Sequence, residues 1–336
     1  ADVAQLKGEN RILVRHGLTW LSQRARPGVA ALKQVAKVKG DVEAYHIGFV
    51  LGPRINAAGR LASGHTALDL LVSDAPDVCR TLAQELDDAN RERREIEDAI
   101  RVEAQAQVDV LFDEEAIFGV VAAGAGWHVG TIGIVASRLV STYHRPSIVI
   151  ALDGEGGGRA SGRSVEGVNL VEMLDACEDL LETHGGHAMA AGLNIRADKV
   201  EAFRERFNAL CSAQLKGTDL RPAQRVDAWI ALGEVDRELF DQSQRLRPCG
   251  MGNPKPVWGA RHVQIAGKPR RVGKDGAHLK LLLAAGRTQL DAIGFGLGPC
   301  KLPDGPIDIV FEIAEDTYRG HGQLQLILKD LALSQG

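Results

Sequence analysis

The spacing of apolar residues predicts one long helix over residues 76–111. No Gly or Pro interrupts this stretch after its first turn. Apolar side chains recur at intervals of three, four or seven residues: Val78, Leu82, Leu86, Ala89, Ile96 and Ile100. That period places them on one face of a helix. The other faces carry a charge run, which we expect to be solvated: Glu85, Asp87, Asp88, Arg91, Arg93 and Arg94. Such a helix suits a connector between two domains.

Residues 113–217 alternate predicted strands with predicted helices. The apolar runs 117–123 and 147–152 are short and rich in β-branched residues, which is typical of strands. Helical patterns cover residues 131–141, 169–181 and 199–215. We therefore predict an α/β domain.

The pattern changes again from about residue 222. Five short strands are separated by turns that are rich in Gly and Pro: residues 257–266, 278–283, 289–293, 307–312 and 323–328. This density of strands predicts a small β-barrel of the OB-fold type. An SH3-like barrel or a sandwich fits the spacing nearly as well.

Composition narrows the class of protein further. The chain has 336 residues, of which 25% are charged, and a net charge of −4, so only local basic patches would bind nucleic acid. Aromatic residues make up 4%, so any surface for stacking bases is small. No apolar run is long enough to cross a membrane. The five cysteines form no C-x-x-C pair. We expect a monomeric, cytoplasmic protein without a membrane partner.

A Gly-Gly-His segment is the first candidate for phosphate chemistry. Gly185 and Gly186 let the backbone approach a ligand closely. The following His-Ala-Met-Ala-Ala is expected to open a helical turn, whose N-terminus attracts a phosphate. His187 would act there as a donor. The alternative is a tight turn followed by a buried helix of small residues.

A second candidate is the Gly-rich stretch around Ser161. If the stretch is extended, Arg159, Ser161 and Arg163 share one face, because side chains alternate along a strand. Two arginines and a hydroxyl can hold a phosphate monoester through charge-assisted hydrogen bonds. A surface loop with solvated arginines is an equally good interpretation of the residues alone.

Trp127 and His128 follow a predicted strand and enter a predicted helix, which is a further anion site. Trp127 is suited to stack on a base, although a Trp at a strand end is more typical of a core.

The segment 52–60 is rich in turn residues. Arg54 and Arg60 are suited to contact phosphates there, and Asn56 to orient a phosphate or a metal-bound water. The alternative is a structural loop that is held by Pro53 and its glycines.

Basic residues also gather within the predicted barrel: Lys268, Arg270, Arg271, Lys274 and Lys280. They are placed to follow a DNA backbone, or are simply solvated. No complete catalytic motif is visible, and metal-dependent hydrolysis needs several converging carboxylates and histidines.

Taken together, the motifs resemble those of RecJ exonucleases, which belong to the DHH phosphoesterase superfamily. The matching segments occur in family order: Asp2-Val3-Ala4, NRILV (10–14), Gly17-Leu18, GPRINAAGRL (52–61), WHVGTIGIVASRL (127–139), RPSIVI (145–150), SGRS (161–164), GGHAMAAG (185–192) and GNPKP (252–256). The resemblance covers essentially the whole chain and is strongest over residues 47–195.

This resemblance implies an order of domains. Residues 1–74 would be the tail of the DHH catalytic domain and 75–112 the connecting helix. Residues 113–217 would form the DHH-associated α/β domain with the GGH motif, and 222–336 an OB-fold-like domain that binds single-stranded DNA. The first residue is not Met, and the family's Asp-His-His motif is absent. We therefore expect a truncated chain that binds DNA but is catalytically incomplete.

The resemblance also implies an activity, namely 5′→3′ exonuclease action on single-stranded DNA that releases mononucleotides in DNA repair and recombination. Mn²⁺ or Mg²⁺ would be the cofactor, with Asp2 as the last metal-ligating aspartate. Ser161 and Arg163 would bind the terminal 5′-phosphate, and His187 a phosphate near the metals. Further substrate contacts would come from the remaining motif residues: Arg54, Asn56, Arg60, Trp127, His128, Arg159, Gly185 and Gly186. A single-stranded-DNA-binding protein and a helicase are the implied partners.

Three other functions remain open. A related phosphoesterase could act on short oligonucleotides or cyclic dinucleotides, but such relatives end after the GGH domain, and the barrel argues against this. The chain could be a DNA-binding module without turnover. It could also be a purely structural α/β protein, which the Arg, His and Gly residues at three element entrances make less attractive.

Overall fold

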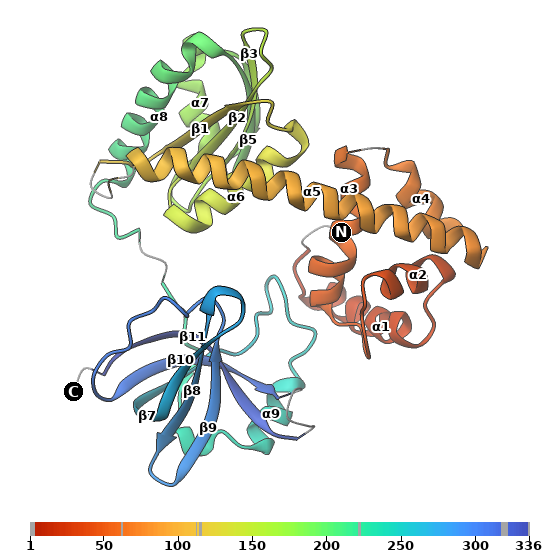
Figure 1. The fold of residues 1–336 in the computed structure, drawn as a ribbon, viewed down its shortest axis with the longest axis vertical. Coiled ribbons are helices and arrows are strands. Elements are labelled where there is room, and N and C mark those ends of the chain that lie inside the picture. Colours follow the sequence, from red (N-terminus) through yellow and green to blue (C-terminus); the bar gives the residue numbers. More distant parts are fainter. Residues whose placement is uncertain are drawn as a thin grey trace. The chain divides into compact units, whose positions relative to one another are not determined.

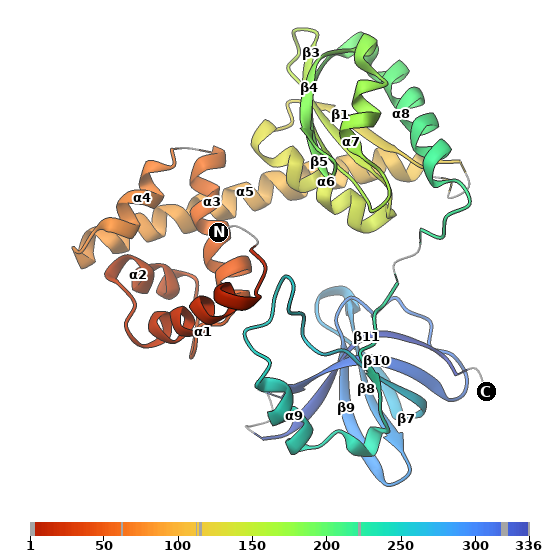
Figure 2. The same cartoon turned by 180° about the vertical axis from the view of Figure 1, so that it is seen from behind.

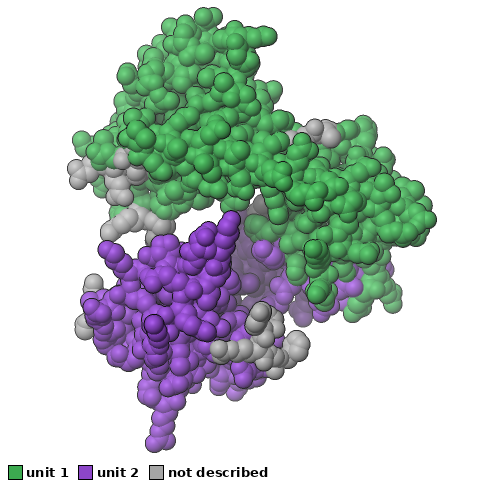
Figure 3. All heavy atoms as spheres, in the orientation of Figure 1, with its two compact units in different colours: residues 1, 23–40, 46–222 green, residues 2–22, 41–45, 223–336 purple. Residues whose placement is uncertain are grey.

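The computed structural model describes residues 4–61, 63–111, 113, 116–220, 223–316 and 322–334. The chain divides into two compact units (Figure 3). Unit 1 comprises residues 1, 23–40 and 46–222, and unit 2 comprises residues 2–22, 41–45 and 223–336. Within the described residues, no helix combines the length and apolar character that crossing a membrane requires.

The first part of unit 1 is helical. Its elements are α2 (Pro27–Val35), the π-helix η1 (His46–Leu51), α3 (Gly52–Leu61), α4 (His65–Val72) and the first half of α5 (Pro76–Leu111). Leu32, Leu70 and Leu86 are at most 1% exposed and form the centre of this helical core. The segment 52–60, which is rich in turn residues and for which a structural loop was the alternative interpretation, forms α3 instead. Pro53 lies in the first turn of α3, directly after η1.

The long helix α5 is confirmed over its whole predicted length (Figure 1). Its buried apolar residues belong to two cores, with Leu86 in the helical core and Ile100 in the α/β core. The expectation that its charge run is solvated is wrong at Arg93, which is 8% exposed. Arg93 donates hydrogen bonds to Glu97 Oε2 at 2.8 Å and to Asn90 Oδ1 at 3.2 Å. These polar groups are buried because they pair with one another.

The second part of unit 1 is a five-stranded sheet in the order β1-β2-β3-β5-β4. The strands are β1 (Val120–Ala125), β2 (Ser147–Leu152), β3 (Gly157–Arg163), β4 (Leu181–His187) and β5 (Ala190–Arg196). β1 and β2 are parallel and are joined by α6 (Val129–Tyr143), whereas the other neighbours are antiparallel. The α/β architecture is therefore confirmed.

Helices cover both faces of this sheet (Figures 1 and 2). Along β2, Val149 joins the core formed with α5 and α6, while Ile148 joins the core formed with α7 (Leu170–Asp175) and α8 (Val200–Leu215). This alternation is the period of a strand that is buried on both faces. The helix predicted over residues 169–181 is shorter, because the short 3₁₀ helix η2 (Glu178–Leu180) leads directly into β4.

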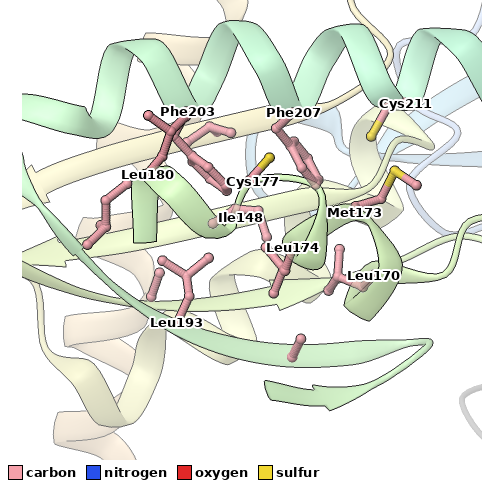
Figure 4. Close-up of a cluster of buried hydrophobic side chains, with 14 of the residues drawn as sticks. Ile148, Leu170, Met173, Leu174, Cys177, Leu180, Leu193, Phe203, Phe207 and Cys211 are labelled. Atoms are coloured by element: carbon pink, nitrogen blue, oxygen red, sulfur yellow. The ribbon is translucent and has the colours of Figure 1, made fainter. Parts of the chain in front are cut away.

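Stacked aromatic rings fill the core beneath α8 (Figure 4). The rings of Phe203 and Phe207 lie 5.7 Å apart between centroids, and both residues are fully buried. Cys177 and Cys211 lie in the same core. Burial raises the pKa of the Cys177 thiol to about 11 and that of Cys211 to about 12. Both thiols therefore act as small apolar side chains and not as nucleophiles.

The Gly-Gly-His segment does not open a helix as we predicted. It ends β4, and β5 begins with Ala190, shortly after His187, so the two strands form a hairpin. The physical reason is visible in β5, where Ala191, Leu193 and Ile195 are buried alternately. A period of two buries these side chains on a sheet and would scatter them around a helix.

The two glycines of the hairpin differ in what they tolerate. Gly186 has φ +146°, and a Cβ there would lie 2.5 Å from the Ala190 carbonyl oxygen. Gly185 has open space at the same position. We expect Gly186→Ala to lower the free energy of unfolding by more than about 1 kcal/mol and Gly185→Ala to leave it nearly unchanged. Urea denaturation of the two variants measures this, and equal losses would contradict it.

Unit 2 is built on a β-barrel. Its sheet has the order β10-β11-β9-β8-β7-β6, and a further pairing of β10 with β7 closes it. The strands are β6 (Ala228–Trp229), β7 (Trp258–Val272), β8 (His278–Ala285), β9 (Thr288–Gly294), β10 (Ile307–Glu315) and β11 (Leu324–Leu333). The five predicted strands are confirmed, and β6 is a short addition. Leu283, Ile309 and Phe311 lie fully buried at the centre.

Unit 2 also contains helices outside the barrel. Helix α9 (Arg237–Gln244) precedes β7, and α1 (Gly8–Gln23) comes from the start of the chain. The Leu6 N–H donates to the Met251 carbonyl at 2.7 Å, and Arg11 Nη2 donates to the Leu246 carbonyl at 3.0 Å. These hydrogen bonds attach the beginning of the chain to the loop that precedes the barrel strands.

Candidate nucleic-acid interface

Strand β3 presents three polar side chains on one face of the sheet. Arg159, Ser161 and Arg163 alternate with residues that are buried, which confirms that they share a face. Their partners on β2 are Ala151, Val149 and Ser147, so this is the face on which α5 and α6 lie. The side chains of β3 therefore add a polar region to the sheet face that α5 and α6 cover.

The neighbouring strands extend this polar face. Arg163 is in register with Ala190 of β5, which faces His187 of β4. Ser161 is in register with Gly192 of β5, which is in turn in register with Gly185 of β4. Because neither glycine has a side chain, the sheet face beside Ser161 is open. His187 is exposed. The arrangement brings the hydroxyl, the guanidinium and the imidazole to one surface, as a phosphate site requires.

The Arg163 side chain is held in place by its own strand. Its Nη1 donates to Ser161 Oγ at 3.1 Å and to the Gly162 carbonyl at 2.7 Å. Gly133 of α6 lies alongside, since a Cβ there would stand 3.0 Å from Ser161 Oγ and 3.1 Å from Arg163 Nη2. Burial, followed by the positive charge of Arg60, lowers the pKa of Arg163. An anion at this point would offset the electrostatic cost.

The sites expected at the start of α6 are used for packing and capping. Trp127 is 6% exposed, and its Nε1 donates to Glu103 Oε2 at 2.8 Å, which places its ring in the core and not on the surface. His128 is the N-cap of α6, and its Nδ1 accepts a hydrogen bond from the Gly130 N–H at 3.0 Å. Arg60 Nη1 donates to the Gly130 carbonyl at 2.8 Å.

The three polar residues expected from α3 have different surroundings. Arg54 Nε forms an ion pair with Asp87 at 2.7 Å, and the Arg54 side chain is 12% exposed. Its charge therefore already has a partner within the helical core. Asn56 and Arg60 are exposed and line a pocket of about 390 Å³.

Each unit also carries a further polar surface. In unit 1, Arg159 lines a hollow of about 240 Å³ on the sheet together with Thr183, His184, Gly185 and Asn194. His184 is bound there through Nε2 to Asp175 Oδ1 at 2.8 Å.

In unit 2, Lys268, Arg270 and Lys280 line a pocket of about 310 Å³ on the barrel, together with one carboxylate, Asp291. Arg270 of β7 lies directly opposite Lys280 of β8, and like charges in this position destabilise a sheet. Phe295, whose side chain is 59% exposed, follows β9 and packs edge-on against His278 at 5.2 Å between centroids. Basic and aromatic side chains on one barrel are a typical surface for single strands.

Asp2, the expected metal ligand, lies outside the described residues. Within the described part of the chain, no three or more His, Cys, Asp or Glu side chains gather so that they could hold a metal ion. Those residues therefore do not fit a Mn²⁺ or Mg²⁺ site, whereas their arginines fit phosphate groups.

Sequence reasoning missed five charged residues of the 390 Å³ pocket as site residues: Arg93, Arg94, Glu97, Asp98 and Arg138. The spacing of Arg93 and Glu97 by four residues signals a helical ion pair. Nothing in the local sequence joins Arg138 to that pair.

Comparison with known proteins agrees with this geometry. The DHHA1 domain family matches residues 116–213, and the RecJ OB domain family matches residues 226–330. The single-stranded-DNA-specific exonuclease RecJ of Bacillus subtilis is 35% identical over 348 residues, covering 100% of this chain and 43% of the relative. RecJ of Escherichia coli is 33% identical over 344 residues, covering 98% of this chain and 59% of the relative.

Solved structures give the same result. RecJ from Thermus thermophilus in complex with Mn²⁺ superimposes with a TM-score of 0.86 at 29% identity, covering 100% of this chain and 48% of that one. A structure of exonuclease RecJ bound to manganese has a TM-score of 0.54 at 32% identity and covers 64% of this chain and 54% of that one. The chain thus spans about half the length of these relatives.

Proposed function

We propose that this chain, which is a RecJ homologue with a DHHA1 domain and a RecJ OB domain, acts in a 5′→3′ exonuclease specific for single-stranded DNA. The enzyme would release mononucleotides in DNA repair and recombination. It would work in the cytoplasm beside a single-stranded-DNA-binding protein and a helicase. The observation that carries the proposal is the polar sheet face, on which Arg163 lies in register with His187 across Ala190, and Ser161 lies on the same face two residues earlier in β3.

On this proposal the described residues bind the strand and position its end. Ser161 and Arg163 hold the terminal 5′-phosphate, which sets the polarity of digestion, and His187 donates to a phosphate oxygen. The basic surface of the barrel holds the strand further along. Cleavage relies on Mn²⁺ or Mg²⁺, whose donors do not gather among the described residues. We therefore propose that those residues bind DNA and do not by themselves hydrolyse it.

A phosphoesterase that acts on short oligonucleotides or cyclic dinucleotides is the second candidate. It would also use the polar sheet face. The opposed Arg270 and Lys280 on the barrel favour the exonuclease, because a substrate of two or three nucleotides has no need of a second cationic surface.

Binding of a 5′-phosphorylated single strand, compared with the same strand carrying a 5′-hydroxyl, tests the proposed function. Tighter binding of the phosphorylated strand by this chain is the expected result. Equal binding of the two strands would contradict the proposed site for the terminal phosphate. Failure to bind either strand would favour the phosphoesterase that acts on short substrates.

The exposed ring of Phe295 is expected to stack on a base of the bound strand. Phe295→Ala should weaken binding of oligo(dT) by about 1–3 kcal/mol. An oligomer of abasic nucleotides should bind the variant and the original chain equally, because only the bases meet the ring. Fluorescence anisotropy measures both, and an equal loss for the abasic strand would assign Phe295 a structural role instead.

A further inference from the structure

The five-stranded sheet of unit 1 has two edge strands, and side chains occupy the backbone of one of them. In the order β1-β2-β3-β5-β4, the outer strands are β1 and β4. Gln107 of α5 binds the outer backbone of β1 twice, since its Nε2 donates to the Ala123 carbonyl at 2.9 Å and its Oε1 accepts from the Ala123 N–H at 3.2 Å. Arg204 Nε donates to the Val121 carbonyl of the same edge at 3.1 Å. No further strand can pair with β1 at these positions.

The hydrogen bonds beside β4 show which of its backbone groups point outward. The Ser164 N–H donates to the Met189 carbonyl at 3.0 Å, so Met189 faces β3. The next residue, Ala190, therefore faces the opposite way and pairs with His187 of β4. Because this pattern alternates along an antiparallel pair, His184 directs its N–H and C=O away from β5. Among the described residues, neither group has a hydrogen-bond partner.

The open part of β4 lacks the features that commonly protect an exposed edge. Proteins protect such edges with lysine, proline, bulges or covering side chains. β4 contains neither Lys nor Pro. A register shift between Leu181 and Thr183 distorts only its beginning. The backbone from Thr183 onward is therefore available to an added strand.

The surroundings of this edge are acidic. Residues 164–195 contain no Lys or Arg, but they contain six carboxylates: Glu166, Glu172, Asp175, Glu178, Asp179 and Glu182. Asp175 pairs with His184, and Asp179 pairs with Arg206. Glu178 and Glu182 come directly before the open backbone, are exposed, and form no ion pair with a described residue. The edge therefore attracts positive charge.

We propose that the β4 edge binds an extended, lysine- or arginine-rich segment of a partner protein as a sixth strand of the sheet. Backbone hydrogen bonds to His184 supply the affinity, and the acidic side chains select a basic sequence. A second copy of this chain is a poorer occupant, because it brings the acidic residues of two copies together.

The docking edge is separate from the phosphate site of the proposed function and does not depend on it. Ser161 and Arg163 offer side chains above the face of the sheet, whereas the docking edge offers backbone groups in the plane of the sheet. The two sites also attract opposite charges. A result at one site therefore leaves the other untouched.

Proline at position 184 tests the backbone contact by itself. His184→Pro removes the outward N–H, which the sheet does not use, so an edge strand tolerates the change. His184→Ala is the matched control, because it keeps the N–H and also loses the ion pair with Asp175. The probe is a peptide of about seven residues with alternating lysine and threonine. A peptide of alternating glutamate and threonine is its control.

Calorimetric titration should show equal binding of the lysine peptide to the original chain and to His184→Ala. Binding to His184→Pro should be weaker by about tenfold, because one hydrogen bond and the pairing around it are lost. Glu182→Gln should weaken binding by about two- to fivefold, and less at high salt. The glutamate peptide should not bind.

Several outcomes would overturn the docking edge. Absence of binding by the lysine peptide would do so, as would equal binding of the two peptides or equal binding to the proline and alanine variants. If circular dichroism shows that His184→Pro is unfolded, unchanged affinity in Glu182→Gln decides against the proposal. Self-association of the original chain that His184→Pro abolishes would assign the edge to a second copy instead.

Discussion

Replacing Arg163 with Gln is expected to abolish the preference of this chain for single strands that carry a 5′-phosphate. Arg163 is half-buried, is held by Ser161 Oγ and the Gly162 carbonyl, and bears a charge that burial and Arg60 make costly. Hydrogen bonds from a charged donor contribute about 1.5–3 kcal/mol each. The affinity for the phosphorylated strand should therefore fall by about 10- to 100-fold, as measured by fluorescence anisotropy at fixed salt.

The matched control for this prediction is Arg196→Gln. Arg196 ends β5, is exposed and pairs with Asp198. Removing it changes the net charge of the chain by the same amount, so a general electrostatic effect would weaken both variants equally. Affinity for the 5′-hydroxyl strand should be the same in both. A variant at Arg163 that still distinguishes the two strand ends would show that the terminal phosphate binds elsewhere.

The largest expected effect on stability comes from Phe207→Ala. The ring is fully buried, stacks on Phe203, and lies against the backbone of Gly119, where a Cβ would stand 2.8 Å from it. A phenylalanine of this kind leaves a cavity that the surrounding backbone cannot readily fill. We expect the free energy of unfolding to fall by about 3–5 kcal/mol, a large share of the stability of a typical domain.

Urea denaturation followed by circular dichroism measures this loss. Phe295→Ala is the matched control, because it removes the same side chain from an exposed position on the barrel. It should change stability by no more than about 0.5 kcal/mol. A loss below about 1 kcal/mol for Phe207→Ala would mean that the core beneath α8 can repack around the missing ring.

The elements with a clear period could be predicted from the sequence. The long helix α5, the strand β2 and the five barrel strands follow from apolar residues that recur at helical or strand intervals. The shared face of Arg159, Ser161 and Arg163 followed from the same reasoning. In each case the side chains that form the core also predict the backbone conformation, because they are large, apolar and regularly spaced.

The hairpin of β4 and β5 could not be predicted in this way. The segment around Gly185 and Gly186 consists of small residues that fit a helix and a strand equally well. Buried and more exposed residues alternate regularly only after Ala190. Two chain segments must also pair before Gly186 meets the Ala190 carbonyl, and no local pattern contains that information.

The candidate site shows the same limit. Arg54 and Arg60 belong to one motif and looked equivalent, yet Arg54 is paired with Asp87 while Arg60 lines the pocket. The difference arises from the orientation of α3 against α5, which is a tertiary property. The meeting of Arg93 with Arg138 through Glu97 likewise depends on how α6 packs on α5.

The shared helix α5 has a consequence for how unit 1 loses its structure. The helix is 36 residues long, or about 54 Å, and its two halves contribute side chains to two separate cores. Melting either core removes the support from one half of the helix and loosens the hydrogen-bond ladder towards the other. The amides of its central turns, around Arg93, should therefore exchange with solvent only in openings that involve both cores. The helical part and the α/β part of unit 1 are then one cooperative unit in hydrogen exchange, although each has its own hydrophobic core.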